Sequence, residues 1–278
     1  MTQAISRGYV PGPHGQLHYR QAGPQGAVAG RPLVLFHQNP SSSFEFEVLM
    51  AELARDRRVL AFDTPGYGMS DGPSEPLSMA GYAGILADAL PAVGIDSALG
   101  CDVYGFHTGA LIAVEVALAR PDLVRAVALT GLPMRSPEER AERLAAARNP
   151  TPLDEAGETA MGLARRLWDF VVVNRSKGVT LARAAENWID KLRTLDRITW
   201  AYVGVWSFNF EARMPLLKQP VLLLQPHEEI LRQSIAAVAL CPDHRVVEMP
   251  EWSRDIFDIP EAVTRIGEEL RRFLDQSH

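Results

Sequence analysis

The chain has 278 residues, and 47% of them are hydrophobic, so it is long enough to bury the large core of an enzyme-sized domain. Its 34 acidic and 28 basic residues give a net charge of -6 and are spread along the chain without a basic stripe, which argues against nucleic acid as a partner. Two cysteines are too few for a disulfide framework or a cysteine zinc site, and no signal peptide or membrane-spanning run is evident, so we expect a soluble cytoplasmic protein without a membrane partner.

Strand-like and helix-like segments alternate along most of the chain. Residues 15–21 alternate polar and apolar side chains, as a strand of a hairpin does. Continuous apolar runs then follow, and helical stretches separate them, which indicates strands of a parallel sheet with both faces covered. These runs are residues 33–36, 59–62, 103–106, 124–129, 221–224 and 246–249. We therefore predict an α/β fold with a doubly wound, mostly parallel sheet.

Residues 136–214 interrupt this alternation, because they contain helical patterns without a convincing buried strand. We predict that they form a helical cap, or lid, and that residues 1–135 and 215–278 form the core domain. The predicted cap holds a large share of the aromatic residues, including Trp168 and Trp206. Such residues commonly form the small core of an insertion, but they are also candidates for contact with a substrate in an apolar pocket.

A sharp turn follows the apolar run at residues 103–106. Gly105 and Gly109 bracket three residues, and a helical stretch begins directly afterwards. This order is the strand, turn and helix of a nucleophile elbow, with His107 at its apex. The pentapeptide alone is weak evidence, because 21 glycines would produce roughly one or two such patterns by chance.

Two other segments stand in the matching order. Residues 37–40, His-Gln-Asn-Pro, follow one apolar run, and residues 63–71, Asp-Thr-Pro-Gly-Tyr-Gly-Met-Ser-Asp, follow the next. Together with the elbow, they resemble the oxyanion loop and the Asp-x-x-Gly-x-Gly-x-Ser segment of the α/β-hydrolase family. The resemblance extends over essentially the whole chain and implies an α/β-hydrolase fold that acts on a small molecule. We expect no cofactor and no metal, because no spacing of His, Asp, Glu or Cys suggests a metal site.

The catalytic positions depart from the pattern of that family, in which a nucleophile, an acid and a histidine follow in chain order. His107 stands at the nucleophile position. Glu229 stands at the acid position, with Glu228 as the alternative. The histidine position falls on Ser253 or on Arg254, depending on the anchor used for counting. Ser253 facing His107 would preserve a serine–histidine contact with the partners exchanged, whereas Arg254 would form an ion pair with Glu229 or bind a substrate carboxylate.

Backbone groups do not depend on these substitutions. In this fold an oxyanion hole is made of backbone N–H groups, which here would belong to Gln38 and Thr108. His37, which opens the same loop, is either a structural residue or a substrate contact. The imidazole of His107 reaches beyond the place of a serine hydroxyl, into the volume that an ester carbonyl occupies during attack. General acid/base work therefore suits His107 better than direct nucleophilic attack.

Three classes of function remain open from the sequence. The first is a hydrolase of esters or C–C bonds with an atypical site, acting on a small apolar carbonyl compound. The second is a lyase, isomerase or cyclase that uses His107 and the oxyanion hole on an enolate. The third is a ligand-binding protein without catalysis, since fold resemblance alone does not settle chemistry. We rank the hydrolase first. The sequence does not decide the oligomeric state.

Overall fold

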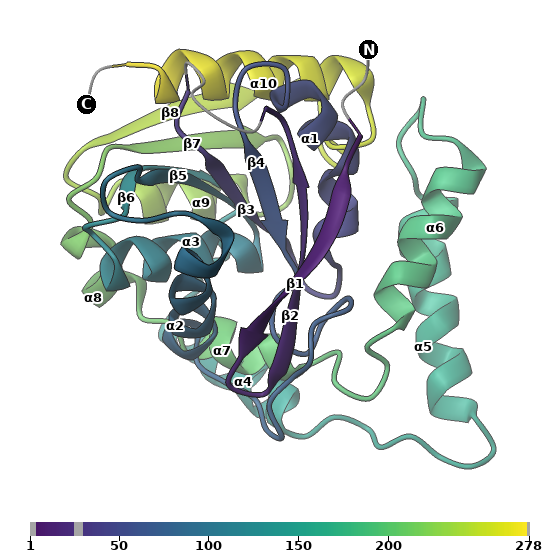
Figure 1. Ribbon diagram of the computed structural model, residues 1–278. Coiled ribbons are helices and arrows are strands. Elements are labelled where there is room, and N and C mark those ends of the chain that lie inside the picture. The colour runs from purple at the N-terminus through teal and green to yellow at the C-terminus, as the bar shows by residue number, and fades with distance from the viewer. Residues whose placement is uncertain (1–3, 25–29, 277–278) are drawn as a thin grey trace.

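An eight-stranded sheet forms the centre of the protein in the computed structural model, which describes residues 4–24 and 30–276 (Figure 1). The strands lie in the order β1-β2-β4-β3-β5-β6-β7-β8. The pairs β1·β2 and β2·β4 are antiparallel, and all other neighbours run parallel. This confirms the predicted doubly wound, mostly parallel sheet. The strands are β1 (Ser6–Gly12), β2 (Gly15–Ala22), β3 (Leu33–Phe36), β4 (Val59–Phe62), β5 (Cys101–Phe106), β6 (Val124–Thr130), β7 (Val221–Pro226) and β8 (His244–Met249).

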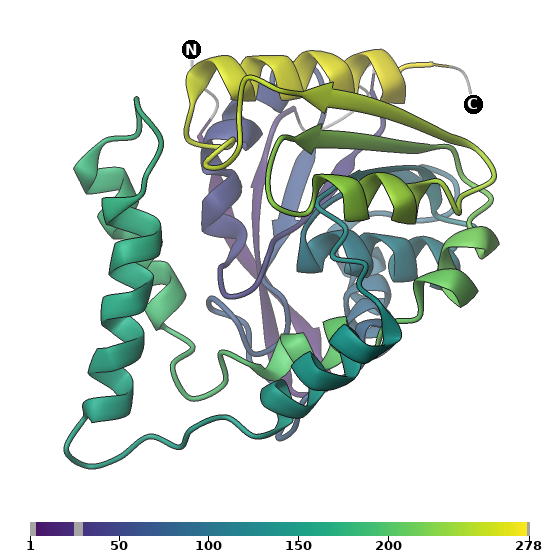
Figure 2. The ribbon, with the colours of Figure 1, turned by 180° about the vertical axis from the view of Figure 1, so that it is seen from behind.

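Helices cover both faces of the sheet, as continuous apolar strands require (Figure 2). Successive side chains of a strand point to opposite faces, so Val34 of β3 belongs to one hydrophobic core and Leu35 to the other. Helices α2, α3 and α9 pack on the first core, and α1 and α10 pack on the second. Their bounds are α1 (Glu47–Leu53), α2 (Met79–Ala89), α3 (Thr108–Ala119), α9 (Leu231–Val238) and α10 (Pro260–Leu274), with short 3₁₀ turns at Ser43–Phe46 (η1), Pro91–Val93 (η2) and Met214–Leu216 (η4).

Helices without an intervening strand make up the segment predicted as a cap. They are α4 (Pro137–Arg148), α5 (Glu158–Trp168), a π-helical turn η3 (Asp169–Val173), α6 (Leu181–Leu192), α7 (Trp200–Ser207) and α8 (Phe210–Arg213). Helices α5 and α6 form a hairpin that stands beside the core, and α4 packs against α7 (Figures 1 and 2). The division into a core and a cap at residues 136 and 214 stays a prediction. No helix in the described ranges is long and apolar enough to cross a membrane.

Polar contacts join helix α6 to two loops of the core. The Asp258 carboxylate accepts hydrogen bonds from Arg183 Nε and Asn187 Nδ2, each at 2.7 Å. The Ser42 hydroxyl donates to Asp190 Oδ1 at 2.8 Å. Ser42 lies in the loop after β3, and Asp258 lies between β8 and α10. The helical segment is thereby held against the loops where the sequence places its candidate site residues.

Candidate active site

The elbow apex at His107 has the strained backbone that a sharp strand-to-helix turn requires. His107 has φ 52° and ψ −111°, a conformation that costs energy for a residue with a side chain. Its N–H donates to the Thr130 carbonyl at 2.7 Å, which fixes the apex to the neighbouring strand β6. A Cβ on Gly109 would lie 1.9 Å from the Phe36 carbonyl oxygen, and one on Gly105 would lie 2.1 Å from the Gly109 carbonyl oxygen. The two glycines are therefore needed for close backbone contact.

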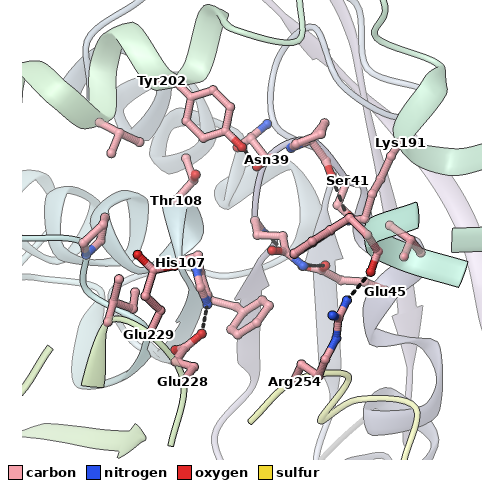
Figure 3. A pocket seen from close by; sticks show the side chains of 18 of the residues that line it. Asn39, Ser41, Glu45, His107, Thr108, Lys191, Tyr202, Glu228, Glu229 and Arg254 are labelled. Carbon is pink, nitrogen blue, oxygen red and sulfur yellow. Dashed lines mark hydrogen bonds and ion pairs between the residues drawn. The ribbon is translucent and has the colours of Figure 1, made fainter. Parts of the chain in front are cut away.

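The His107 ring is paired with a carboxylate from another loop. Nε2 of His107 lies 2.9 Å from Oε2 of Glu228, and Figure 3 shows the two side chains facing each other. Oε1 of Glu228 accepts a hydrogen bond from Gln225 Nε2 at 2.8 Å, and Gln225 Oε1 in turn accepts the Gly131 N–H at 3.1 Å. If Nε2–H donates to the carboxylate, Nδ1 of the neutral ring is the acceptor. In that tautomer, the chain of contacts leaves Nδ1 of His107 as the ring nitrogen that can accept a proton.

Gly131 and Phe106 fix the plane of the His107 ring. A Cβ on Gly131 would lie 2.6 Å from Cδ2 and 2.7 Å from Nε2 of His107, and Gly131 also has a φ of +74°. On another side, the Phe106 ring contacts the imidazole edge-on, with ring centroids 4.3 Å apart. The imidazole is therefore positioned by packing as well as by its hydrogen bond.

The structure separates the two adjacent glutamates after β7. Glu228, the alternative in the sequence, contacts His107, and 15% of its side chain is exposed. The Glu229 side chain is 88% exposed and lies 3.5 Å from Arg135. The acid that the fold brings to His107 is consequently Glu228, which corrects the first choice of Glu229.

Neither candidate for the histidine position pairs with His107. Ser253 and Arg254 both line the pocket, but no hydrogen bond joins Ser253 to His107 in the part of the chain that the structure describes. The Arg254 guanidinium lies over the Phe170 ring at 4.6 Å and donates to the Phe170 carbonyl. It forms its ion pair with Asp255, at 3.3 Å, rather than with Glu229. Arg254 thus connects the loop after β8 to the helical segment.

The oxyanion loop differs most from the expectation. The Gln38 N–H donates to Oε1 of Glu45 at 2.8 Å, and Gln38 Nε2 donates to Oε2 of Glu45 at 2.9 Å. The backbone N–H that was expected in the oxyanion hole is therefore already bound to Glu45. His37 is buried and does not line the pocket: its Nε2 accepts the Thr64 N–H at 2.9 Å, and its Nδ1 donates to the Gln38 carbonyl at 2.6 Å. This corrects its assignment as a substrate contact.

Sequence reasoning missed Glu45, which lines the pocket and is largely buried. Burial raises the pKa of the Glu45 carboxyl, and the Lys191 ammonium offsets this only in part. The one local signal was an acidic residue between two phenylalanines, Phe44 and Phe46, in the loop after the first apolar run. That signal is weak, because the direction of the side chain is not encoded by its neighbours.

A pocket of about 870 Å³ lies in front of these groups. His107, Thr108, Glu45 and residues of the predicted cap line it. Trp206 is among its lining residues, whereas Trp168 is not; Trp168 packs edge-on against Trp188 with centroids 5.2 Å apart. Among residues 4–24 and 30–276, no group of His, Cys, Asp and Glu is arranged to hold a metal ion. The pocket has the size of a small-molecule site.

The chain belongs to the α/β-hydrolase family: the family model described as "alpha/beta hydrolase fold" matches residues 31–259. It is 27% identical over 207 residues to the protein named "Putative carbamate hydrolase RutD" from Pseudomonas savastanoi pv. phaseolicola, covering 71% of this chain and 76% of that protein. It is also 33% identical over 117 residues to haloalkane dehalogenase 2 from Mycobacterium tuberculosis, which covers 41% of this chain and 38% of that protein.

Solved structures agree on the fold. Epoxide hydrolase A from Mycobacterium thermoresistibile superposes with a TM-score of 0.78 at 18% identity and covers 98% of this chain and 99% of its own. The enol-lactonase from Burkholderia xenovorans LB400 gives a TM-score of 0.76 at 20% identity over 97% of this chain and 100% of its own. At these identities the likeness concerns the fold alone, and the reaction has to be argued from the site.

Proposed function

We propose that this protein is a hydrolase of small, largely apolar carbonyl compounds, esters or compounds with a cleavable C–C bond, and that His107 acts as a general base toward water. The observation that carries the proposal is the contact of His107 Nε2 with Glu228 at the elbow apex, beside the pocket. The carboxylate stabilises the imidazolium that forms when Nδ1 takes a proton. Membership of a hydrolase family supports the choice of water as the second reactant.

The reaction needs no covalent intermediate. Nδ1 of His107 takes a proton from water while the water oxygen forms a bond to the carbonyl carbon. The imidazolium then gives that proton to the leaving group as its bond to the same carbon breaks. The Thr108 N–H, at the first position of α3, has no partner within that helix and supports the carbonyl oxygen at the helix N-terminus.

Adjacent glutamates provide a matched test of this assignment. We expect Glu228→Gln and His107→Ala to lower kcat by 10²-fold or more, within the range of roughly 10²–10⁴ that general acid–base groups contribute. Glu229→Gln removes a charge one residue away, from an 88% exposed side chain, and serves as the control that keeps its rate. The assay is a substrate panel of 4-nitrophenyl butyrate, a γ-lactone, an aryl carbamate and a β-diketone. Unchanged turnover in His107→Ala would refute the proposal.

The route is tested by labelling. With H₂¹⁸O in a single turnover, direct attack by water places ¹⁸O in the acid product, and a serine-directed fluorophosphonate leaves the protein unlabelled. Stoichiometric labelling of Ser253 would instead support the exchanged serine–histidine pair. A product without oxygen from water would assign the site to a lyase or isomerase, and tight capture of ligands without any product would assign the protein to the binding class.

A further inference from the structure

The pocket contains a second group able to hold a proton, on the loop after β3. Glu45 belongs to the short turn η1, and its two carboxylate oxygens each accept one hydrogen bond from Gln38. Each oxygen of a carboxylate has two lone pairs, so one on each oxygen remains after Gln38 is satisfied. Glu45 lines the same pocket as His107 but comes from a different loop, as Figure 3 shows.

The core holds the Glu45 turn firmly in place. The Ser43 N–H donates to Asp63 Oδ1 at 2.7 Å, and the Ser43 hydroxyl accepts from Arg20 Nη1 at 2.6 Å. Ser42 caps the turn by accepting the Phe44 N–H. Asp63, Ser43 and Arg20 are all buried. The position of Glu45 in the pocket therefore follows from built-in contacts on both sides of the residue.

Little positive charge compensates the Glu45 carboxylate. Lys191, which lies within electrostatic reach, donates its hydrogen bond to the Pro40 carbonyl at 2.9 Å. The His37 ring and the hydrogen bonds from Gln38 also lower the pKa of Glu45, but burial outweighs these effects together. Burial raises the pKa of Glu45 under these conditions. Charged or titratable side chains around η1 also include Asp190 and Arg183 on α6, Asp63 after β4, Tyr104 on β5, Arg20 on β2 and Glu47 on α1.

An ionised carboxylate at this position is incompatible with an oxyanion at the Gln38 N–H. Two negative charges a few ångströms apart in a site of low dielectric repel each other by several kcal/mol. A protonated carboxyl at the same place has the opposite effect, because it donates a hydrogen bond to the carbonyl oxygen. The protonation state of Glu45 thus decides whether this side of the pocket opposes or assists attack on a carbonyl.

We propose that Glu45 is a second catalytic residue, the general acid that protonates the substrate carbonyl oxygen in place of the Gln38 side of an oxyanion hole. This inference rests on the proposed hydrolytic function. As the water oxygen bonds to the carbonyl carbon and Nδ1 of His107 takes the water proton, the carboxyl proton of Glu45 passes to the carbonyl oxygen, so the tetrahedral intermediate is neutral. When that intermediate collapses, the hydroxyl proton returns to Glu45 as C=O re-forms, and His107 protonates the leaving group. All protons are returned, and no further reactant is needed.

Glu45→Gln removes the acidic proton and keeps a polar side chain of similar size in the site. The new amide accepts the Gln38 N–H through its oxygen and pairs with a flipped Gln38 amide, so the loop keeps its hydrogen bonds. With 4-nitrophenyl butyrate we expect a loss of roughly 10²–10⁴ in kcat with little change in KM. We also expect the loss of the falling side of the pH–rate profile at high pH, which reports the acid. Glu47→Gln, two residues on and outside the pocket lining, is the control that keeps both rate and profile.

A binding measurement tests the same inference without turnover. The ketone 4-nitroacetophenone presents a carbonyl oxygen and contains no cleavable bond. For the unaltered protein we expect its affinity to fall as the pH rises through the ionisation of Glu45, while the affinity of Glu45→Gln stays constant with pH. Circular dichroism and thermal midpoints establish that each variant is folded.

Several outcomes would overturn the role of Glu45. A rate and pH profile of Glu45→Gln equal to those of the unaltered protein would leave Glu45 as a positioning residue for Gln38. Faster turnover of Glu45→Ala would make the carboxylate an obstacle, and stronger binding of benzylamine than of the ketone at high pH, lost in Glu45→Gln, would make it a cation site. If His107→Ala abolishes turnover and Glu45→Gln does not alter it, only this inference fails. If His107→Ala is fully active, the proposed function itself fails.

Discussion

Replacement of Gly131 by alanine is expected to displace the His107 imidazole without replacing any titratable group. The new Cβ would lie 2.6 Å from Cδ2 of His107, whereas ordinary contact begins at about 3.4 Å, so the ring must retreat by about 0.8 Å, the difference between the two. The hydrogen bond to Glu228 is 2.9 Å long, and N···O contacts beyond about 3.5 Å are no longer hydrogen bonds. A retreat of this size is therefore enough to break it.

Two contributions to the free energy of unfolding can be separated. Alanine at the positive φ of Gly131, +74°, costs about 1–2 kcal/mol through backbone strain alone. Loss of a hydrogen bond to a charged group costs about 1.5–3 kcal/mol. Because His107 is 28% exposed and Glu228 15% exposed, the lower end of that range applies. We expect a total destabilisation of about 3 kcal/mol and a fall in kcat of at least 10²-fold, because the proposed base, displaced by this distance, is no longer aligned.

Gly157 offers a matched control for the strain. Its φ is +78°, and a Cβ there would meet nothing within 4 Å. Gly157→Ala should therefore cost about 1–2 kcal/mol from strain and leave kcat unchanged. Urea unfolding gives the free energies, and the imidazole ¹⁵N spectrum reports whether the hydrogen bond from His107 Nε2 persists.

A double-mutant cycle tests whether the cost of Gly131→Ala depends on the His107 ring. In a His107→Ala background the ring is absent, so Gly131→Ala should cost no more than Gly157→Ala, and the coupling energy between residues 107 and 131 should be about 1.5 kcal/mol. If Gly131→Ala destabilises the unaltered protein and the His107→Ala variant equally, the packing argument for the ring is refuted.

Two further predictions concern buried carboxylates. Burial alone would raise the pKa of Asp63, but hydrogen bonds from His18 and the Ser43 N–H lower it to about 2, against 3.8 for an ordinary aspartate. The carboxylate therefore contributes about 2 kcal/mol of stability that is present above pH 4 and is lost as the pH falls to 2. The free energy of unfolding of Asp63→Asn in urea should therefore vary less over that interval than that of the unaltered protein. An equal pH dependence of the two proteins would contradict this. Arg213 donates to both oxygens of the buried Glu115 at 2.7 and 2.6 Å. We expect Arg213→Met to lower the free energy of unfolding by about 2 kcal/mol. This is less than the roughly 3–5 kcal/mol lost when a fully buried pair is broken, because Arg213 is partly exposed. Glu115→Leu combined with Arg213→Met should regain more than half of that loss in the same assay, and no recovery would argue against an unpaired buried charge as the cause.

Local pattern was sufficient for the sheet and the elbow. The apolar run at Leu33–Phe36 predicted a strand buried on both faces, and the structure places it in the middle of the sheet. Gly105 and Gly109 predicted a tight turn, and both are needed where backbone meets backbone. Such features are readable because each depends on residues within a few positions along the chain.

The local sequence pattern did not predict the direction in which side chains point. Trp168 and Trp206 have similar chemistry and lie in the same predicted cap, yet only Trp206 lines the pocket. The sequence left His37 as either a structural residue or a substrate contact, and both of its ring nitrogens contact the backbone of Gln38 and Thr64. Which way a side chain points depends on the elements packed around it, and single-sequence patterns do not contain that information.

The sequence by itself determined the α/β fold, the elbow and the presence of a histidine at its apex. Only the tertiary structure chose Glu228 over Glu229, because adjacent residues of the same chemistry leave a turn in different directions. It also placed the Glu45 carboxylate on the N–H of Gln38, through a loop that the core anchors. Periodicity and turn residues encode the backbone path locally, whereas the pairing of buried polar groups is settled only when distant segments meet and each donor must find an acceptor.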